Sequence, residues 1–264
     1  MGKLIEGRVL RRVAAERGLG LDLIETDYAL GWMLKGVSST SVSGDLVFKG
    51  GTALSKVYYP LNWRLSEDLD FTLLGGSMEG VSAKLKEELP GIVEEQSGGI
   101  RPRLRDPYVK PDFLRVTVSF NGPITQHRTR IEVTRERFIG DFGRLMAPDS
   151  YDCPTFSLLV YTLENILAEK LRSLIERTRI RDYYDSWRLL SMNVVDEGLV
   201  KGLFLEKCRG KEISFSGGDQ LFPGDLLSML EPPLDDLTRI TVEPLPLLKD
   251  MIRELRDQLE HILR

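Results

Sequence analysis

The chain has 264 residues, enough for one large domain or two modest ones, each with its own hydrophobic core. Hydrophobic residues make up 42% and charged residues 29%, with no repeat or low-complexity segment, which excludes solenoids and disordered scaffolds. The formal net charge of −4 excludes a uniformly basic protein that coats polyanions, although a local basic groove is enough to bind nucleic acid.

Cysteines and histidines offer little for catalysis. Cys153 and Cys208 lie far apart with no metal-like spacing, which suits a reducing compartment without a disulfide framework. His127 and His261 are the two histidines, so the sequence contains no zinc cluster and no Ser-His-Asp or Cys-His pairing. Acid–base work therefore falls to carboxylates, lysine or a metal. Because no signal peptide or membrane span is recognisable, we expect a cytoplasmic protein that does not enter a membrane.

The N-terminal segment, residues 1–40, is predicted to be helical. Two apolar stripes at helical spacing are separated by Gly18 and Gly20. The first stripe comprises Ile5, Val9 and Val13, and the second comprises Leu21, Ile24, Tyr28 and Trp32. We expect two helices that act as a cap on the domain that follows.

Residues 41–150 are predicted to form an α/β core. A short apolar run at 46–48 follows a serine-rich loop, and apolar and polar residues alternate at 68–73, 114–120 and 130–134. This period of two places each apolar set on one face of a sheet. A helix over about 82–95 crosses between strands. The fold class we expect is α+β, with a mixed sheet flanked by helices.

Residues 151–264 are predicted to form a helical C-terminal domain. One helix begins near Thr162, and Gly and Pro pairs break the pattern later. The last segment, about 247–262, has an amphipathic stripe that favours core packing or a partner-facing helix over any chemical role.

Three carboxylates on predicted strands indicate a metal site. Asp68 and Asp70 lie two apart on one strand, so their side chains project from the same face. Two carboxylates this close disfavour each other's ionisation, and such a pair often holds a cation. Oxygen-only coordination suits Mg²⁺ or Mn²⁺. Glu132, on the polar face of another strand, is the proposed third ligand. The alternative is a pair of exposed strand carboxylates, but Leu69 and Phe71 indicate a half-buried strand.

A glycine turn precedes this pair. A strand runs into Gly50 and Gly51 and then into helix-forming residues, with Thr52 as the expected N-cap. Glycines let the backbone approach a ligand, and the N–H groups of a helix start favour phosphate. The spacing is not that of a Walker A loop. The alternative is an ordinary strand-to-helix turn, which the closely following Asp pair disfavours.

Lys170 interrupts an apolar helical face. The face runs through Leu163, Ile166, Leu167, Leu171, Leu174 and Ile175, and we expect it to continue through Arg177 to Arg181, Asp182 and Asp185. An unpaired cation there would be costly to bury. We predict that Lys170 reaches a triphosphate and that Asp182 and Asp185 orient the basic side chains around it. The alternative is a lysine that extends to solvent.

Two basic clusters are candidates for nucleic-acid contact. The first comprises Arg101, Arg103, Arg105, Lys110 and Arg115, for which solvated surface is an equally good interpretation. The second comprises Arg172, Arg177, Arg179 and Arg181, for which contact with a ligand is favoured.

Four segments together resemble the AbiEii/AbiGii nucleotidyltransferase toxin family, in the DNA polymerase β-like nucleotidyltransferase superfamily. They are Lys49-Gly50-Gly51-Thr52-Ala53-Leu54, Arg64-Leu65-Ser66-Glu67-Asp68-Leu69-Asp70-Phe71, Glu169-Lys170-Leu171-Arg172 and Arg181-Asp182-Tyr183-Tyr184-Asp185. Glu25-Thr26-Asp27-Tyr28 is similar to a segment that often precedes the glycine turn. The resemblance covers about residues 25–190. Thr26 stands where a lysine is usual, and Glu132 stands in place of an aspartate.

The resemblance implies transfer of a nucleoside monophosphate from a nucleoside triphosphate to an acceptor hydroxyl, with release of pyrophosphate. It implies a polymerase β-like core, a transfer RNA 3′ end as acceptor and a cognate antitoxin as partner. Asp68, Asp70, Glu132 and Lys170 are the expected catalytic residues, and the three carboxylates are the expected ligands of Mg²⁺ or Mn²⁺. The expected nucleotide-binding residues are Lys49, Gly50, Gly51, Thr52, Arg64, Ser66, Arg181, Asp182 and Asp185.

Three functions remain open on the sequence alone. The first is a toxin-like enzyme that modifies transfer RNA, and the second is the same chemistry on a protein or small-molecule hydroxyl. The third is a catalytically silent nucleotide-binding partner protein, which the intact Asp68, Asp70 and Lys170 disfavour.

Overall fold

The computed structural model describes residues 4–60 and 62–263. The chain divides into two compact units. Unit 1 comprises Met1–Glu136 and Gly143–Val160, and unit 2 comprises Arg137–Phe142 and Tyr161–Arg264. The helical segment at residues 1–40 lies within unit 1. The three-part division drawn from the sequence stays a prediction about domain organisation.

Two helices begin unit 1, α1 (Gly7–Arg17) and α2 (Leu21–Ser38). Gly18 ends α1 in the left-handed conformation (φ 64°), and its N–H donates to Ala14 and Ala15 carbonyl oxygens. Buried residues occupy most of α2, which packs against α4, β2 and β5. The predicted break between two helices at Gly18–Gly20 is confirmed.

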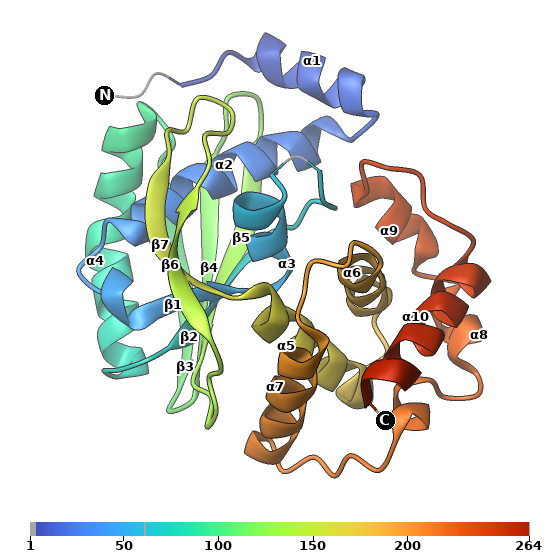
Figure 1. The fold of residues 1–264 in the computed structure, drawn as a ribbon. Coiled ribbons are helices and arrows are strands. Elements are labelled where there is room, and N and C mark those ends of the chain that lie inside the picture. The colour runs from blue at the N-terminus through green and yellow to red at the C-terminus, as the bar shows by residue number, and fades with distance from the viewer. Residues whose placement is uncertain (1–3, 61, 264) are drawn as a thin grey trace. The chain divides into compact units, whose positions relative to one another are not determined.

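Unit 1 is built around a seven-stranded mixed sheet (Figure 1). Its order is β3-β4-β5-β2-β1-β7-β6, with β2 parallel to β5, β1 parallel to β7, and β1–β2, β3–β4 and β4–β5 antiparallel. The strands are β1 (Leu46–Lys49), β2 (Asp68–Leu73), β3 (Arg103–Lys110), β4 (Phe113–Asn121), β5 (Gln126–Thr134), β6 (Phe142–Ala147) and β7 (Phe156–Tyr161). The predicted fold class, α+β with a mixed sheet flanked by helices, is confirmed.

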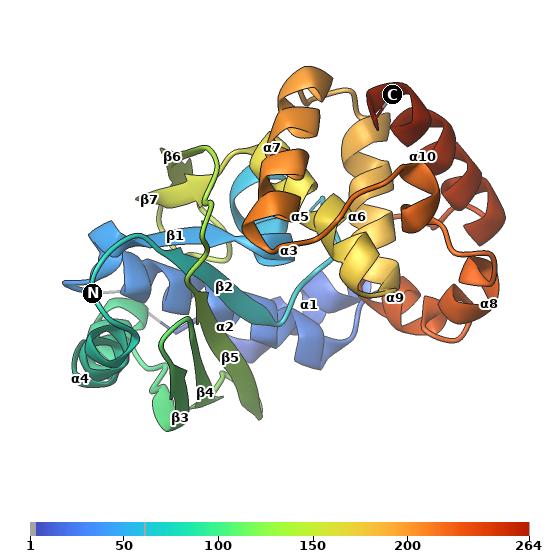
Figure 2. The same ribbon diagram turned by 90° about the horizontal axis from the view of Figure 1, so that it is seen from below.

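The two faces of strands β2, β4 and β5 differ as the alternation predicts. Buried apolar side chains such as Leu69, Phe71, Val116 and Ile131 share one face, against which α2 and α4 (Met78–Ser97) pack (Figure 2). The opposite face carries the polar partners of β2, β4 and β5, together with Val47 and Lys49 of β1. A short connection, η1 (Ser43–Asp45), leads into β1, and α3 (Gly50–Ala53) with η2 (Leu54–Tyr58) follows it.

Strands β3, β6 and β7 were not predicted. Most of β3 is exposed, so its apolar alternation is weak, and its pairing with β4 shifts register between Arg105 and Tyr108. Asp106 in that shift has a positive φ of 47° and Pro107 follows it, which is typical of a β-bulge. The sequence therefore marks this strand as a basic cluster rather than as a strand.

Unit 2 is predominantly helical, as expected. Its helices are α5 (Leu163–Glu176), α6 (Ile180–Ser191), α7 (Glu197–Gly210), α8 (Leu226–Leu230), α9 (Leu234–Ile240) and α10 (Leu248–Leu263), with η3 (Gly218–Leu221) between α7 and α8. Helix α5 packs against α6 and α7, and α10 packs against α6. Within the described residues, no helix has the length and apolar character that a membrane crossing requires.

The expected continuation of the Lys170 face beyond Arg177 is wrong. Helix α5 ends at Glu176, and Arg177 has an extended backbone (φ −159°, ψ 143°). Asp182 and Asp185 therefore lie on a second helix, α6, that packs against α5.

Candidate functional site

The three predicted metal ligands lie on one face of the sheet in unit 1. Asp68 and Asp70 are alternate residues of β2, and the register of β2 with β5 places Glu132 beside Asp70. The register of β1 with β2 places Lys49 on the other side of Asp70. Neighbouring residues in register project to the same side of a sheet. Lys49, Asp70 and Glu132 therefore form one row across the strands, and Asp68 lies in the adjacent row beside Arg130.

Two arginines that the sequence analysis did not assign to the site partner these carboxylates. Arg130 is bidentate to Asp68, with Nε–Oδ1 3.0 Å and Nη2–Oδ2 2.7 Å, and Arg115 Nε lies 2.7 Å from Glu132 Oε1. Hydrogen bonding to Asp68 raises the pKa of Arg130. Strand alternation could have found Arg130, which lies two residues before Glu132. The Arg130 and Asp68 side chains are 52% and 32% exposed, so each can exchange its partner at little cost.

The glycine turn touches the site directly. Gly50 has a φ of +77°, and a Cβ there would lie 2.8 Å from Asp70 Oδ2. A Cβ on Gly51 would lie 2.5 Å from Arg64 Nη2 and 3.3 Å from Ser66 Oγ. The two glycines therefore allow the backbone to approach a carboxylate and a guanidinium more closely than any other residue would. This close approach brings together Gly50, Gly51, Arg64, Ser66 and Asp70.

Thr52 has a different local role from the one expected. It is the third residue of α3, whose N-cap is Lys49, and no side chain caps the helix. The Thr52 hydroxyl instead donates a 2.5 Å hydrogen bond to the Asp68 backbone oxygen. Thr52 thus ties the glycine turn to the backbone of β2 at Asp68, and its prediction as an N-cap is wrong.

Lys49 and Arg64 are buried cations beside the carboxylates. Lys49 Nζ lies 3.1 Å from Glu136 Oε1, in a pair whose side chains are both almost fully buried. Arg64 is 3% exposed, and its Nη1 donates to the Ser66 hydroxyl at 3.3 Å. Glu136, the counter-charge of Lys49, was not predicted. Because a buried cation requires a partner, Lys49 and Glu136 form a structural pair next to Asp70.

The donor set fits a hard divalent cation in its chemistry. Asp68, Asp70 and Glu132 offer carboxylate oxygens, which Mg²⁺ and Mn²⁺ prefer. Among residues 4–60 and 62–263, no three His, Cys, Asp or Glu side chains already converge as a metal cluster. Instead, Arg130 forms an ion pair with Asp68 and Arg115 forms one with Glu132. A cation at this site would therefore replace arginine contacts on partly exposed oxygens.

The remaining predicted residues belong to unit 2. Lys170 Nζ lies 3.2 Å from Asp182 Oδ1 and 2.6 Å from Asp185 Oδ2, and all three side chains are at most 8% exposed. Arg177 Nε lies 3.2 Å from the other Asp182 oxygen. The alternative in which Lys170 extends to solvent is wrong, because Lys170 is buried and paired. Arg181, next to Asp182, is half-buried.

The Glu25–Tyr28 segment is entirely buried in α2. Glu25 accepts hydrogen bonds from the Ile124 and Thr125 amides and lies 2.8 Å from His127 Nε2. Asp27 pairs with Lys56 at 2.7 Å. These contacts hold the β4–β5 turn and η2 against α2, which gives this segment a scaffold role in unit 1.

Neither cysteine is suited to nucleophilic chemistry. Cys153 and Cys208 are free and buried. Burial raises the pKa of each thiol to about 11, so the thiolate is scarce at neutral pH.

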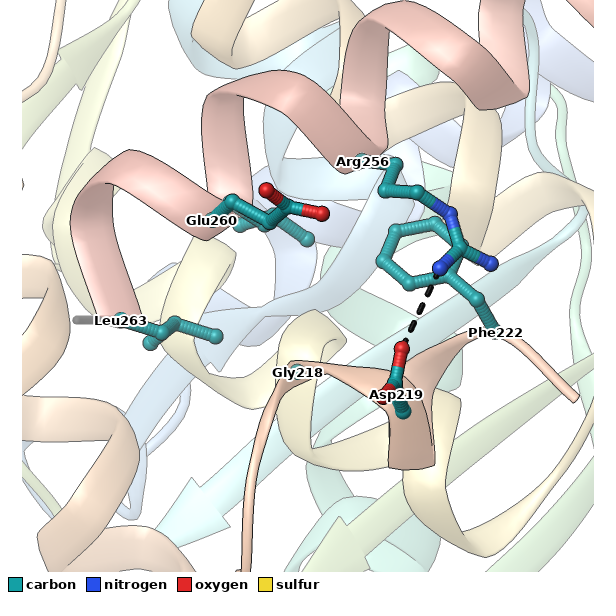
Figure 3. A pocket seen from close by; sticks show the side chains of 7 residues that line it. Gly218, Asp219, Phe222, Arg256, Glu260 and Leu263 are labelled. Carbon is teal, nitrogen blue, oxygen red and sulfur yellow. Dashed lines mark hydrogen bonds and ion pairs between the residues drawn. The ribbon is translucent and has the colours of Figure 1, made fainter.

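Unit 2 also contains a cavity of about 270 Å³ (Figure 3). Asp219 and Arg256 face each other across it at 3.2 Å, and the Arg256 guanidinium lies 4.6 Å from the centre of the Phe222 ring. Asp219 and Arg256 are thus engaged with each other, and no predicted site residue lines the cavity. We assign it no part in the chemistry.

An Asp-x-Asp pair beside a Gly-Gly turn is the arrangement expected of a nucleotidyltransferase. The family model described as "Nucleotidyl transferase AbiEii toxin, Type IV TA system" matches residues 32–262, and the chain belongs to this family. The predicted family is confirmed. No curated protein matches the chain.

Solved structures agree on the fold. The chain is similar to MenT4, a nucleotidyltransferase toxin from Mycobacterium tuberculosis H37Rv, with a TM-score of 0.79 and 20% identity over 98% of this chain and 89% of that one. It is also similar to JHP933 from Helicobacter pylori, with a TM-score of 0.58 and 18% identity over 93% of each chain.

Proposed function

We propose that this nucleotidyltransferase transfers a nucleoside monophosphate from a nucleoside triphosphate to the 3′ end of transfer RNA, with Mg²⁺ or Mn²⁺. The observation that carries the proposal is the placement of Asp68, Asp70 and Glu132 on one sheet face beside the Gly50–Gly51 turn. Family membership supports the general reaction and an antitoxin partner. The cytoplasm is the expected compartment.

Asp68, Asp70 and Glu132 would hold the divalent cation. Bound there, it would neutralise charge on the triphosphate and lower the pKa of the attacking hydroxyl. Arg130 and Arg115 would leave the carboxylates on loading, which frees two guanidinium groups next to the reacting phosphate. Arginine suits phosphate because its N–H donors match two oxygens at once.

The turn would bind the phosphates of the substrate. Gly50, Gly51 and Thr52 carry backbone N–H groups at the start of α3, where the first amides of a helix have no intrahelical acceptor. Arg64 and Ser66 lie directly against Gly51, so their guanidinium and hydroxyl would adjoin phosphate held by the turn and stabilise charge on the departing pyrophosphate. Lys49 keeps the end of β1 in place beside Asp70.

Lys170, Arg181, Asp182 and Asp185 are proposed to act from unit 2. To bind the triphosphate, the Lys170 ammonium must either leave Asp182 and Asp185 or contact the phosphate while it keeps them. The function proposed above rests on the carboxylates of unit 1 and stands without Lys170.

The acceptor is identified by where the transferred label goes. We would incubate the protein with each labelled nucleoside triphosphate and total RNA, and locate the label. Label at the 3′ end of transfer RNA is expected, and it should vanish with excess chelator or with RNA whose terminal diol is oxidised by periodate. Label on protein or a small molecule would replace the RNA acceptor. Nucleotide binding without transfer would favour the silent partner protein.

Glu132 has its own test, because it lies on β5 rather than on the strand of the Asp pair. Glu132→Gln should lower transfer about tenfold or more if it holds a cation, with a stability change within about 1 kcal/mol because its pair with Arg115 is partly exposed. Glu67→Gln is the matched control, since Glu67 is an exposed carboxylate next to Asp68. Equal activity in both variants would remove Glu132 from the metal site.

A further inference from the structure

The polar face of strands β3, β4 and β5 is strongly basic. Six cations project from it. Among the residues of these three strands that share this face, Glu132 is the acidic one. The six cations are Arg103, Arg105 and Lys110 on β3, Arg115 on β4, and Arg128 and Arg130 on β5. We call this surface the basic face. The net charge of the whole chain is −4, so this is a local concentration of positive charge.

The register connects the basic face to the carboxylates. Arg105 pairs with Thr117, Thr117 with Arg130, and Arg130 with Asp68, which gives one row across four strands. Neighbouring strands lie about 4.8 Å apart, so this row is about 14 Å long. A polyanion bound along it would end at the Asp68–Asp70 pair.

Aromatic rings lie among these cations. Tyr108 is 49% exposed, and its ring centre lies 6.2 Å from that of Phe113. Lys110 Nζ lies 5.4 Å from the Tyr108 ring centre, and the Arg115 guanidinium lies 5.2 Å from that of Phe113. Exposed rings beside cations are what unpaired nucleic-acid bases stack on.

Part of the basic face is available for a ligand. Arg103, Arg105 and Arg128 are exposed, and within the part of the chain that the structure describes they have no ion pair. Arg115 and Arg130 differ, because they contact Glu132 and Asp68. These three solvated arginines on one face are therefore free to contact phosphates without breaking a described ion pair.

We propose that the basic face binds the single-stranded end of the acceptor RNA and leads its terminal hydroxyl to Asp68 and Asp70. This inference rests on the proposed function. Phosphates would contact Arg103, Arg105 and Arg128, and a base would stack on Tyr108. An acidic protein would satisfy the charges equally well, but the row of cations that ends at the reacting carboxylates and the exposed ring favour an RNA strand.

The test removes the three arginines that lie outside the catalytic set. Arg103→Gln, Arg105→Gln and Arg128→Gln are combined, and the matched control combines Arg8→Gln, Arg11→Gln and Arg12→Gln on α1, which changes the net charge equally. Binding of a labelled transfer RNA and of a short single-stranded RNA is measured at several salt concentrations. Transfer is measured to transfer RNA and to a dinucleotide, which is too short to span the face.

The face variant should bind RNA at least about tenfold more weakly, and its log–log salt slope should be smaller by about 2, since three contacts each contribute about 0.7 on a single strand. The control should keep the native slope. Transfer to the dinucleotide should be unchanged and KM for transfer RNA should rise. Tyr108→Ala should weaken binding about tenfold, whereas Tyr108→Phe should bind normally because stacking needs only the ring.

Native affinity and slope in the face variant would overturn the inference and leave the proposed function intact. Loss of antitoxin binding with unchanged RNA binding would assign the face to a protein partner instead. If RNA binds through this face but receives no label, the proposed function fails while the surface stands. The two failures are therefore distinguishable.

Discussion

The two units each contain a cluster of carboxylates and cations, but the clusters differ in burial. In unit 1, Asp68 and Glu132 pair with arginines whose side chains are about half exposed. In unit 2, Lys170 pairs with Asp182 and Asp185, and all three side chains are at most 8% exposed. The ion pairs in the two units therefore have the same chemistry, but the free energy needed to break them differs greatly.

Burial decides which of these pairs can exchange a partner. An exposed ion pair contributes about 0–1 kcal/mol, so a metal ion or a phosphate can replace one member. Removing one member of a buried pair leaves an uncompensated charge and costs about 3–5 kcal/mol. The unit 1 cluster is thus suited to bind and release ligands, and the unit 2 cluster is suited to stay in place. Variants at each cluster test this contrast.

The largest effect is expected at Asp70. Asp70→Asn keeps the size of the side chain but removes a charge that a cation requires, so transfer should fall by about a thousandfold or more while the melting temperature stays nearly native. Asp112→Asn, an exposed carboxylate in the turn before β4, is the control and should be fully active. Substantial activity in Asp70→Asn, or undiminished activity in excess chelator, would contradict the metal site.

Lys170→Ala tests the buried cluster. It should lower the free energy of unfolding by about 3–5 kcal/mol, because Asp182 and Asp185 lose their buried cation. A role at the triphosphate adds a second consequence, a loss of about a hundred- to a thousandfold in transfer per folded molecule. Lys249→Ala, at an exposed position of α10, is the control for both measurements.

The two readouts for Lys170 separate its possible roles. A much lower melting temperature with normal turnover per folded molecule makes Lys170 a scaffold residue. Slow transfer with a native melting temperature would contradict the cost assigned to the buried pair.

Gly50→Ala tests the contact between the glycine turn and Asp70. An alanine with positive φ costs roughly 1–2 kcal/mol, and its Cβ would lie 2.8 Å from Asp70 Oδ2. Gly76→Ala is a matched control, since Gly76 has a φ of +79° but no atom within 4 Å of its Cβ position. Gly50→Ala should lose at least as much stability as Gly76→Ala, because its Cβ also crowds Asp70, and transfer should fall about tenfold or more in Gly50→Ala alone. Equal transfer in the two variants would show that the close approach is dispensable.

Much of the fold follows from local patterns in the sequence. Alternation at 68–73 and 130–134 sets which side chains of each strand share a face, and this is enough to predict that Glu132 lies on the polar face of its strand, as the Asp pair does on its own. Strand β3 was missed because an edge strand exposed on both faces lacks that alternation. The break between α5 and α6 was missed because the residues there, Arg177–Arg179, include neither glycine nor proline.

The partners of the charged residues could not be predicted. Lys49–Glu136, Arg115–Glu132 and Glu25–His127 join residues far apart in sequence, and each depends on strand order and on which loop reaches which helix. The DxD pair and the Gly-Gly turn were predictable because their residues are close in sequence. Their direct contact, Gly50 against Asp70, required the pairing of β1 with β2.

The smallest expected effect is on the pH dependence of stability at Glu25, a buried carboxylate in unit 1 that takes no part in the chemistry. Burial alone would raise the pKa of Glu25, but hydrogen bonds from His127 and from the Ile124 and Thr125 amides outweigh it, so its pKa is lowered. A lowered pKa in the folded state means that the unfolded chain binds the proton first as the pH falls.

The stability contributed by Glu25 is therefore complete above the ordinary carboxyl pKa and is lost as the pH falls through the folded value. Over that interval the free energy of unfolding should decrease by up to about 1.4 kcal/mol per pH unit for this one proton. Glu25→Gln should lack this part of the slope, and Glu16→Gln, at an exposed position of α1, should retain it. Urea unfolding at a series of pH values from about 6 down to 3 measures both slopes, and equal slopes in the two variants would mean that the Glu25 pKa is not lowered by folding.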